Sequence, residues 1–373
     1  MLRHSFQAFH TTFTVDSEYQ FIKELGRGQQ GPVIAAKHQR SGEWCAIKKK
    51  AYIGKKPDLI IQCLREIKAT AHVYGHRNII SLYDVDIVFH SPDSFDVYLF
   101  EELMETDLRS VIHSGQPLTD DHFQAFIYQT LSGIKYIHSA GILHQDLKPG
   151  HILVNPDCEL KICDFGQANN YGPGSRPHHP TDIAMDIAGA RWYRAPEIIL
   201  SAPTISTPID IWSVGCILAE FLGGGKPLFK GKDYVDHLNH ILSYLGTPPD
   251  SALGRIASLR GQYYLRSLSF KPRSPFSTVF PHENPLAVDL LTQMLHIDPA
   301  ERITCEQAIN HTYLEGWYDP ADTLICEYKC DLNFQAEENI DEIRKLLTYN
   351  VDAFRDGVRA QARSAEIYPR PNQ

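Results

Sequence analysis

The segment HQDLKPGHILVNPD, residues 144–157, carries side chains that could support phosphoryl transfer. Asp146 is a candidate base for a substrate hydroxyl, and Lys148 supplies a positive charge for a transferring phosphoryl group. Loops of this layout usually offer magnesium an oxygen ligand at the position where this chain has His151. Magnesium prefers oxygen in near-octahedral geometry, so an imidazole is a poor substitute. We therefore expect His151 to weaken metal-assisted transfer without abolishing it.

A second group of residues with chemical potential lies near the N-terminus, in LGRGQQGPV, which contains Leu25, Gly26, Gly28, Gly31 and Val33. This glycine spacing also serves the dinucleotide-binding fold, where it must lead from a strand into a helix. Here Pro32 and VIAAK continue as a strand, which argues against a dehydrogenase. A flap between two strands lets backbone N–H groups lie against phosphates, and Lys48 on the next strand would be a counter-charge. From this segment alone, an ordinary hairpin with an exposed lysine remains an alternative.

The sequence pattern of the elements that must position these residues changes near residue 103, from strand-like to helical. Up to about residue 103, β-branched and aromatic runs predict strands at 31–37, 44–49, 81–89 and 95–103, with one helix at 59–73. Beyond residue 104 the helical period dominates, and apolar residues three and four apart predict a helix from Thr119 to Gly141. Residues 316–373 turn polar and contain a helical pattern around 337–355.

Further motifs follow in a fixed order along the chain. Glu66 lies in LREIK, DFG occupies residues 164–166, and APE occupies residues 195–197. Together with the glycine loop, Lys48 and the Asp146 loop, they match the ordered signature of a protein kinase over roughly 170 residues. An ordered set of this length is far more specific than any one of its motifs.

With these motifs the chain resembles the mitogen-activated protein kinases from about residue 4 to residue 355. RWYRAPEIIL, FKGKDYVDHLNHILSYLGTPPD and YDPAD are similar to segments of the fungal cell-wall-integrity kinases. The resemblance implies an α+β, two-lobed fold, with an N-lobe sheet and one helix in residues 1–103, a mainly helical C-lobe in 104–315 and a C-terminal extension in 316–373. It also implies a serine/threonine kinase that uses ATP and Mg²⁺ and favours a proline after the acceptor.

The resemblance assigns roles to individual positions. Lys48, held by Glu66, would hold the α and β phosphates. Asp146 would accept the substrate hydroxyl proton, and Lys148 would steady the γ-phosphate. Asp164 would bind magnesium, with His151 at the second metal-binding position. The other nucleotide-binding positions are Leu25, Gly26, Gly28, Gly31, Val33, Met104 for adenine, Leu153 opposite Val33, and Asp107 near the ribose.

Positions connected with activation depart from the family pattern. Met185, Asp186 and Ile187 stand where the family has its Thr-x-Tyr acceptors, and Thr181 is a displaced candidate. Ala190 replaces a family threonine that lies near the catalytic aspartate. We therefore expect that dual phosphorylation no longer switches this protein.

The receptor for the phosphate has changed as well. Relatives clamp a phosphothreonine with three arginines, of which Arg65 remains, while Gln145 and Asn169 occupy the other two positions. The same losses leave open a second class of function, a pseudokinase that sequesters partners without turnover.

The acidic pair Asp319 and Asp322 in YDPAD resembles the docking site that captures basic motifs on activators, substrates and phosphatases. An acidic turn with no partner is the alternative for these residues.

Composition excludes several other classes of function. The chain has 373 residues, 43% of them hydrophobic, and a formal net charge of -9, which gives no global field for nucleic acid or an anionic membrane. No apolar run approaches the ~20 residues of a membrane span. The eight cysteines are scattered, so free thiols and a cytoplasmic or nuclear location are expected.

Overall fold

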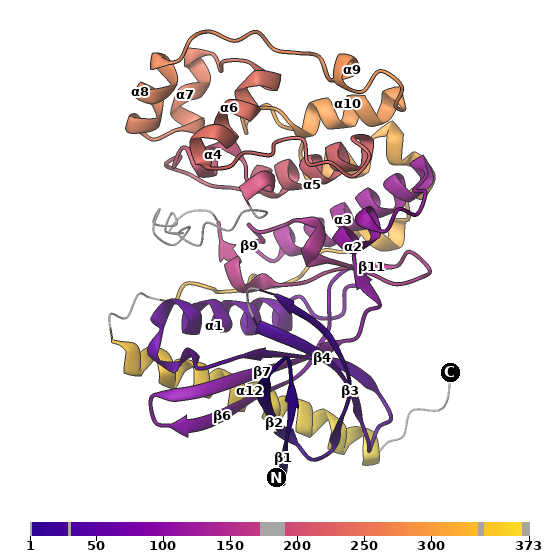
Figure 1. Cartoon of the computed structure of the whole chain (residues 1–373), viewed down its shortest axis with the longest axis vertical. Coiled ribbons are helices and arrows are strands. Elements are labelled where there is room, and N and C mark those ends of the chain that lie inside the picture. The colour runs from indigo at the N-terminus through magenta and orange to yellow at the C-terminus, as the bar shows by residue number, and fades with distance from the viewer. Residues whose placement is uncertain (1, 29–30, 172–190, 335–338, 368–373) are drawn as a thin grey trace. The chain divides into compact units, whose positions relative to one another are not determined.

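The computed structural model describes residues 2–28, 31–171, 191–334 and 339–367 (Figure 1). The described chain forms two compact units. The first contains Met1–Gly75, Ile80–Met104 and Phe334–Gln373, and the second contains His76–Ile79 and Glu105–Asn333. The chain thus leaves the first unit after Met104 and returns to it with the C-terminal residues.

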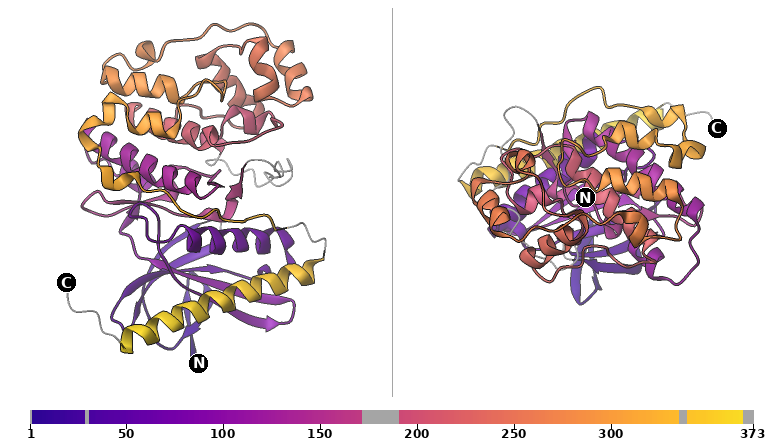
Figure 2. Two further views of the ribbon diagram at one scale, coloured as in Figure 1. Left: turned by 180° about the vertical axis from the view of Figure 1, so that it is seen from behind. Right: turned by 90° about the horizontal axis from the view of Figure 1, so that it is seen from above.

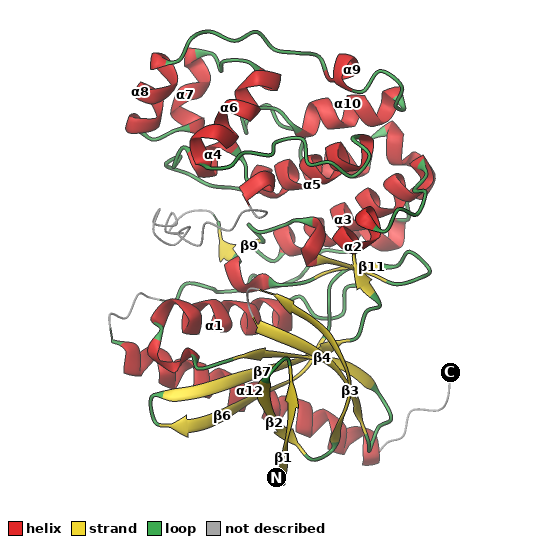
Figure 3. Ribbon diagram, viewed as in Figure 1, coloured by secondary structure: helices red, strands yellow, loops and turns green. Residues whose placement is uncertain are grey.

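The first unit is built on a five-stranded antiparallel sheet in the order β3-β4-β5-β7-β6 (Figure 3). A separate hairpin, β1 with β2, precedes it. The strands are β1 (Arg3–Ala8), β2 (Thr11–Asp16), β3 (Tyr19–Gly28), β4 (Gly31–His38), β5 (Trp44–Lys50), β6 (Leu82–Ser91) and β7 (Ser94–Glu102). The four predicted strands correspond to β4, β5, β6 and β7, whereas neither the β1–β2 hairpin nor the bounds of β3 were predicted.

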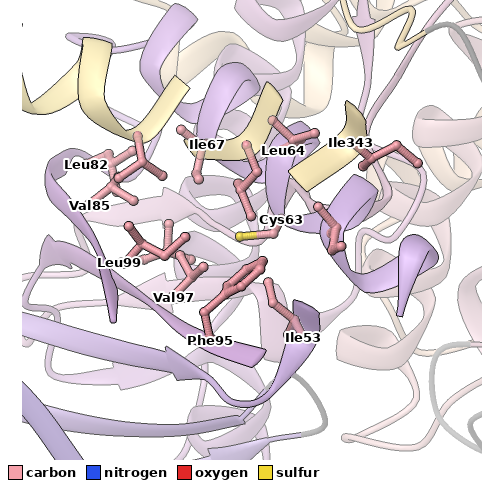
Figure 4. Close-up of a cluster of buried hydrophobic side chains, with 14 residues drawn as sticks. Ile53, Cys63, Leu64, Ile67, Leu82, Val85, Phe95, Val97, Leu99 and Ile343 are labelled. Atoms are coloured by element: carbon pink, nitrogen blue, oxygen red, sulfur yellow. The ribbon is translucent and has the colours of Figure 1, made fainter. Parts of the chain in front are cut away.

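Two hydrophobic cores cover opposite faces of this sheet. On one face, α1 (Pro57–His72) and α12 (Ile340–Ile367) pack on apolar residues of β6 and β7 (Figures 2 and 4). On the other face, Phe13 and Val15 of the hairpin pack on Ile34, Ile47 and neighbouring side chains. Alternation along β5 therefore directs odd-numbered residues to the hairpin and even-numbered residues to α1.

A buried carboxylate ties the chain ends into the first unit. Asp86 of β6 forms ion pairs with Arg3 of β1 and with Arg355 of α12. Burial raises the pKa of Asp86, although both arginines favour its charged form. The helix predicted around 337–355 extends to Ile367, with an apolar face on the sheet and Arg355 at its edge.

The second unit is mainly helical. Thr119 caps α3 as predicted, and α5 is almost wholly buried. Its helices are α2 (Leu108–His113), α3 (Asp120–Ser139), α4 (Pro196–Ile199), α5 (Pro208–Leu222), α6 (Tyr234–Leu245), α7 (Asp250–Ile256), α8 (Leu259–Ser267), α9 (Phe276–Val279), α10 (Pro285–Met294) and α11 (Cys305–Ile309). Short strands complete it: β8 (Thr106–Asp107), β9 (Ile142–Leu143), β10 (Ile152–Val154), β11 (Leu160–Ile162) and β12 (Asn169–Asn170).

Two other expectations are settled by the fold. All eight cysteines are free thiols. Within the described ranges, no helix combines the length and apolar character needed to cross a bilayer.

Candidate active site

The glycine-rich segment forms a turn between β3 and β4, as predicted. Gly26 pairs with Val33 and Gly28 with Gly31, so the chain passes from strand to strand and not into a helix. Gly31 has a φ of 125°, and a Cβ there would lie 1.9 Å from the carbonyl oxygen of Lys49, so only glycine fits. Among the described residues, no atom outside the adjacent residues lies within 4 Å of a Cβ built at Gly26 or Gly28, so the space beside these glycines is open.

The predicted lysine–glutamate pair is formed within the first unit. Lys48 Nζ on β5 donates to Glu66 Oε1 on α1 over 2.8 Å, and the two side chains are 10% and 1% exposed. A buried ion pair of this kind depends on both partners, since removing one leaves an uncompensated charge. Lys50, two residues along β5, forms a second ion pair with Glu66 that was missed at the sequence level.

In the second unit, a network of buried groups holds the catalytic loop. The Asp210 carboxylate of α5 accepts hydrogen bonds from the backbone N–H groups of His144 and Gln145, each over 2.9 Å. It also accepts one from His138 Nε2 over 2.9 Å. Burial alone would raise the pKa of Asp210, but these donors hold it below its usual value. The carboxylate is therefore ionised, and its hydrogen bonds fix the backbone of the loop.

Asp146 and Lys148, the two residues proposed for chemistry, are in contact. Lys148 Nζ donates to Asp146 Oδ2 over 2.8 Å, and both side chains are partly exposed. A base that must meet a substrate hydroxyl needs this combination of a fixed backbone and an accessible carboxylate. The loop then continues into a 3-10 helix, Pro149–His151.

His151 lies between the two aspartates of the site. Its Nδ1 is 2.9 Å from the backbone oxygen of Asp146, and its Nε2 is 3.3 Å from Asp164 Oδ2. Burial lowers the pKa of His151, against the opposing influence of Asp164 and Asp146. A neutral ring would therefore donate from Nδ1 to the Asp146 carbonyl and turn the lone pair of Nε2 towards Asp164.

The donor set fits one magnesium ion better than two. Adjacent ligands of an octahedral magnesium ion lie about 3.0 Å apart, so Asp164 Oδ2 and His151 Nε2 are spaced like neighbouring ligands. The nitrogen is nevertheless a weak ligand for a hard cation. Among the described residues, no group of three or more His, Cys, Asp or Glu side chains could hold a metal ion. Asp164 would thus be the principal protein ligand, with phosphate and water oxygens completing the shell.

Of the other positions predicted to bind the nucleotide, some belong to the first unit and some to the second. Leu25 and Val33 lie on the glycine hairpin, and Met104 is buried at the end of the first unit. Leu153 of β10 pairs with Asp107 of β8 in the second unit. Asp107 also accepts a hydrogen bond from the Ser110 N–H over 2.7 Å and thereby caps α2, which fixes its carboxylate.

Several residues proposed for activation lie outside the described residues, namely Thr181, Met185, Asp186, Ile187 and Ala190. The three receptor positions are described. Arg65 lies on α1, Gln145 adopts a positive φ of 67° in the catalytic loop, and Asn169 pairs with Leu143 across β12 and β9.

The two acidic residues of YDPAD have different surroundings. Asp319 is exposed and accepts a hydrogen bond from the Ala321 N–H over 2.8 Å. Asp322 is 7% exposed, and its Oδ1 lies 3.2 Å from Arg77 Nη1. Its backbone oxygen accepts a hydrogen bond from Ser132 of α3. Asp319 is thus available to a partner, whereas Asp322 is largely occupied in holding the turn.

The buried His76, near this turn, leads us to predict that the free energy of unfolding falls in acid. It accepts a hydrogen bond from the Asn78 N–H at Nδ1, and burial lowers its pKa to about 4. The unfolded chain binds the proton below about pH 6.5 and the folded chain only near pH 4, so the free energy of unfolding falls as pH drops through this window. We expect His76 to account for a decrease on the order of 3 kcal/mol.

The measurement is the denaturation midpoint from pH 7.5 to 4. His237 has a similarly lowered pKa of about 4 from burial, so part of the slope will persist in any His76 variant. His76→Gln should make the slope shallower, and His282→Gln at an exposed histidine should leave it unchanged. An identical slope in His76→Gln and the native chain would contradict the assignment.

A family model described as protein kinase domain matches residues 19–314. Mitogen-activated protein kinase mpkA of Aspergillus fumigatus is 51% identical over 363 residues, covering 97% of this chain and 84% of the relative. Mitogen-activated protein kinase MPS1 of Pyricularia oryzae is 51% identical over 358 residues, covering 96% and 85%. Mitogen-activated protein kinase SLT2/MPK1 of Saccharomyces cerevisiae is 49% identical over 360 residues, covering 96% and 74%. These likenesses extend well beyond the residues of the site.

Proposed function

This chain belongs to the protein kinase family and, within it, to the mitogen-activated protein kinases, and we propose that it works without phosphate on its activation segment. It is a serine/threonine protein kinase that uses ATP and Mg²⁺. The predicted α+β kinase fold and the resemblance to the fungal cell-wall-integrity kinases are confirmed.

The observation that carries the proposal is the formed Lys48–Glu66 pair. In protein kinases this pair must be in place for transfer, and activation-loop phosphorylation commonly controls it. Here the two side chains meet over 2.8 Å in a chain whose sequence has Met185, Asp186 and Ile187 at the family's acceptor positions. The glycine hairpin would place backbone N–H groups against the phosphates, while Lys48 holds them by charge.

The second unit supplies the groups for chemistry. Asp146 would orient the substrate hydroxyl and accept its proton as the bond to phosphorus forms. Lys148 would neutralise charge on the transferring group, from the position where it already contacts Asp146. Asp164 and, more weakly, His151 would hold magnesium, which neutralises charge on the phosphate oxygens when bound.

The family relationship implies which residues would bind the adenosine part of ATP. The backbone of Met104 would bind adenine, and Val33 and Leu153 would contact the two faces of the ring. Asp107 would accept a hydrogen bond from the ribose with the carboxylate that also caps α2. Leu25, at the start of the glycine segment, would cover the outer edge.

Loss of the phosphate acceptors supports activity without a phosphorylation switch. Met185, Asp186 and Ile187 provide no hydroxyl group, and Gln145 and Asn169 provide no positive charge for a phosphate. Ligand and receptor have therefore changed together. We expect the protein to be located in the cytoplasm and the nucleus. Its substrates there would be proteins with Ser-Pro or Thr-Pro sites.

The test is transfer from radiolabelled ATP to a matched pair of peptides, one with Ser-Pro and one with Ser-Ala. The chain is used without treatment by an activating kinase. Preferential labelling of the Ser-Pro peptide would support the proposed function. No labelling of either peptide, with ATP still bound, would favour the pseudokinase alternative.

The exposed carboxylate of Asp319 predicts electrostatic capture of basic docking motifs. Asp319→Asn should weaken binding of a basic peptide by about fivefold at low salt, with a smaller effect as ionic strength rises. Asp322→Asn should mainly lower the melting temperature, because Asp322 is buried and would lose its ion pair with Arg77, whose own side chain is 56% exposed. Fluorescence anisotropy of a labelled peptide measures the first effect.

Glu327→Gln provides the control for this prediction, since it removes an exposed carboxylate nearby in the chain and should leave peptide affinity unchanged. Equal losses in Asp319→Asn and Glu327→Gln would indicate general charge attraction and would contradict a docking site.

A further inference from the structure

Glu66 is held by two lysines from the same strand. Lys48 and Lys50 alternate on β5 so that both face α1, and each is bound to a different oxygen of the Glu66 carboxylate. Lys48 occupies Oε1 through a hydrogen bond, and Lys50 forms an ion pair with Oε2. All three side chains are buried, with exposures of 10%, 7% and 1% for Lys48, Lys50 and Glu66.

Lys50 raises the free-energy cost of moving α1 away from β5. Among the described residues, Oε2 of Glu66 has no hydrogen-bond partner, so the Lys50 ammonium is the charge that compensates this oxygen. If Lys50 were neutral, Lys48 alone would balance the charge of the carboxylate, and Oε2 would be a buried acceptor without a partner. Glu66 would then gain by moving towards water, and α1 would move with it.

We propose that Lys50 is a positioning residue for the ATP-binding pair: by holding Glu66 it keeps α1 against β5, so that Lys48–Glu66 stays formed without phosphorylation. The proposal deepens the proposed function, on which its consequence for nucleotide binding rests. The positioning itself is a property of the first unit and can be measured without catalysis.

The first unit contains a pair of cysteines that report on its two faces. Cys63 lies on α1, three residues before Glu66, inside the core between α1 and the sheet (Figure 4). Cys45 lies on β5 in the core under the hairpin. Burial raises the pKa of each thiol to about 12, so neither reacts readily while its core is closed. Local opening of α1 would expose Cys63 and leave Cys45 protected.

Lys49 offers a matched control from the same strand. It is a lysine of similar burial, but it faces the hairpin side, where Nζ lies 2.8 Å from Asp96 Oδ2. Loss of its charge should disturb the core around Cys45 and not the contact of α1 with β5. Lys49→Met and Lys50→Met thus make the same chemical change on opposite faces of one strand.

The experiment is maleimide labelling of the full chain under native conditions, followed by peptide mass mapping. In Lys50→Met the ratio of Cys63 to Cys45 labelling should rise about tenfold over the native chain. In Lys49→Met it should stay the same or fall. Lys50→Arg, which keeps a positive charge, should restore the native ratio to within about twofold.

The outcomes separate this inference from the proposed function. An unchanged ratio in Lys50→Met, or an equal rise in Lys49→Met, would overturn the positioning role even if the chain is an active kinase. A selective rise in a chain that transfers no phosphate would support the positioning role while the proposed function fails. If Lys50→Met does not fold, the milder Lys50→Gln enters the same comparison, with a smaller selective rise expected.

A second readout addresses the nucleotide. The Kd for ADP, measured by calorimetry, should increase about fivefold in Lys50→Met, because Lys48 loses its fixed partner. Lys49→Met should not change it. Equal affinities in Lys50→Met and Lys49→Met would contradict the link from Lys50 to the ATP-binding lysine.

Discussion

Asp146→Asn is expected to reduce phosphoryl transfer by about 10²–10⁴-fold while leaving the affinity for ATP near its native value. The substitution keeps the size and shape of the side chain but removes the basic oxygen that would receive the substrate proton. It also weakens the contact with Lys148, which donates to Asp146 Oδ2 over 2.8 Å. Steady-state rates with a Ser-Pro peptide, together with ATP binding by calorimetry, make the comparison.

The fold should survive this change because other groups hold the loop. Asp210 fixes the backbone N–H groups of His144 and Gln145 independently of the Asp146 side chain. Asp157→Asn, at an exposed carboxylate later in the same segment, is the matched control and should retain full activity. Equal activity of Asp146→Asn and the native chain would show that Asp146 is not the base.

His151→Asn is expected to raise the rate of transfer by roughly a hundredfold and to shift its magnesium dependence to lower concentrations. The amide offers an oxygen, which is the ligand type that magnesium prefers. The imidazole instead places Nε2 3.3 Å from Asp164 Oδ2. Recovery of one metal contribution, on the order of 3 kcal/mol of transition-state stabilisation, corresponds to this gain.

His282→Asn at an exposed site controls for an effect of the residue type alone. The rate should be measured over a magnesium titration in both variants and in the native chain. If His151→Asn matches the native chain in rate and in magnesium dependence, His151 does not impair magnesium binding, which contradicts the prediction.

The predicted strands and helices were those whose side chains follow a clear period. β4, β5, β6 and β7 have β-branched runs bounded by turn residues, and α3 has an apolar face with a capping threonine. The β1–β2 hairpin was missed although Phe13 and Val15 alternate with polar residues, because each strand has only six residues and few of them are apolar. Its partner surface comes from β4, β5 and β7, which no local pattern reveals.

The sequence predicted the individual residues of the candidate site but not the side-chain contacts between them. The order of motifs indicated Lys48, Glu66, Asp146 and Asp164, whereas no motif singled out Lys50. The KKK run in β5 carried a usable signal, since period-two alternation places Lys50 on the same face as Lys48. The pairing of Asp322 with Arg77 had no such signal, because 245 residues separate the partners.

The central claim is that this chain transfers phosphate without phosphorylation of its activation segment. The most direct measurement is transfer from radiolabelled ATP to a Ser-Pro peptide by the unphosphorylated native chain, compared with Asp164→Ala over a magnesium titration. Magnesium-dependent transfer by the native chain that is lost in Asp164→Ala is the result we predict. Native activity no greater than that of Asp164→Ala at every magnesium concentration would contradict the claim and leave a partner-binding role.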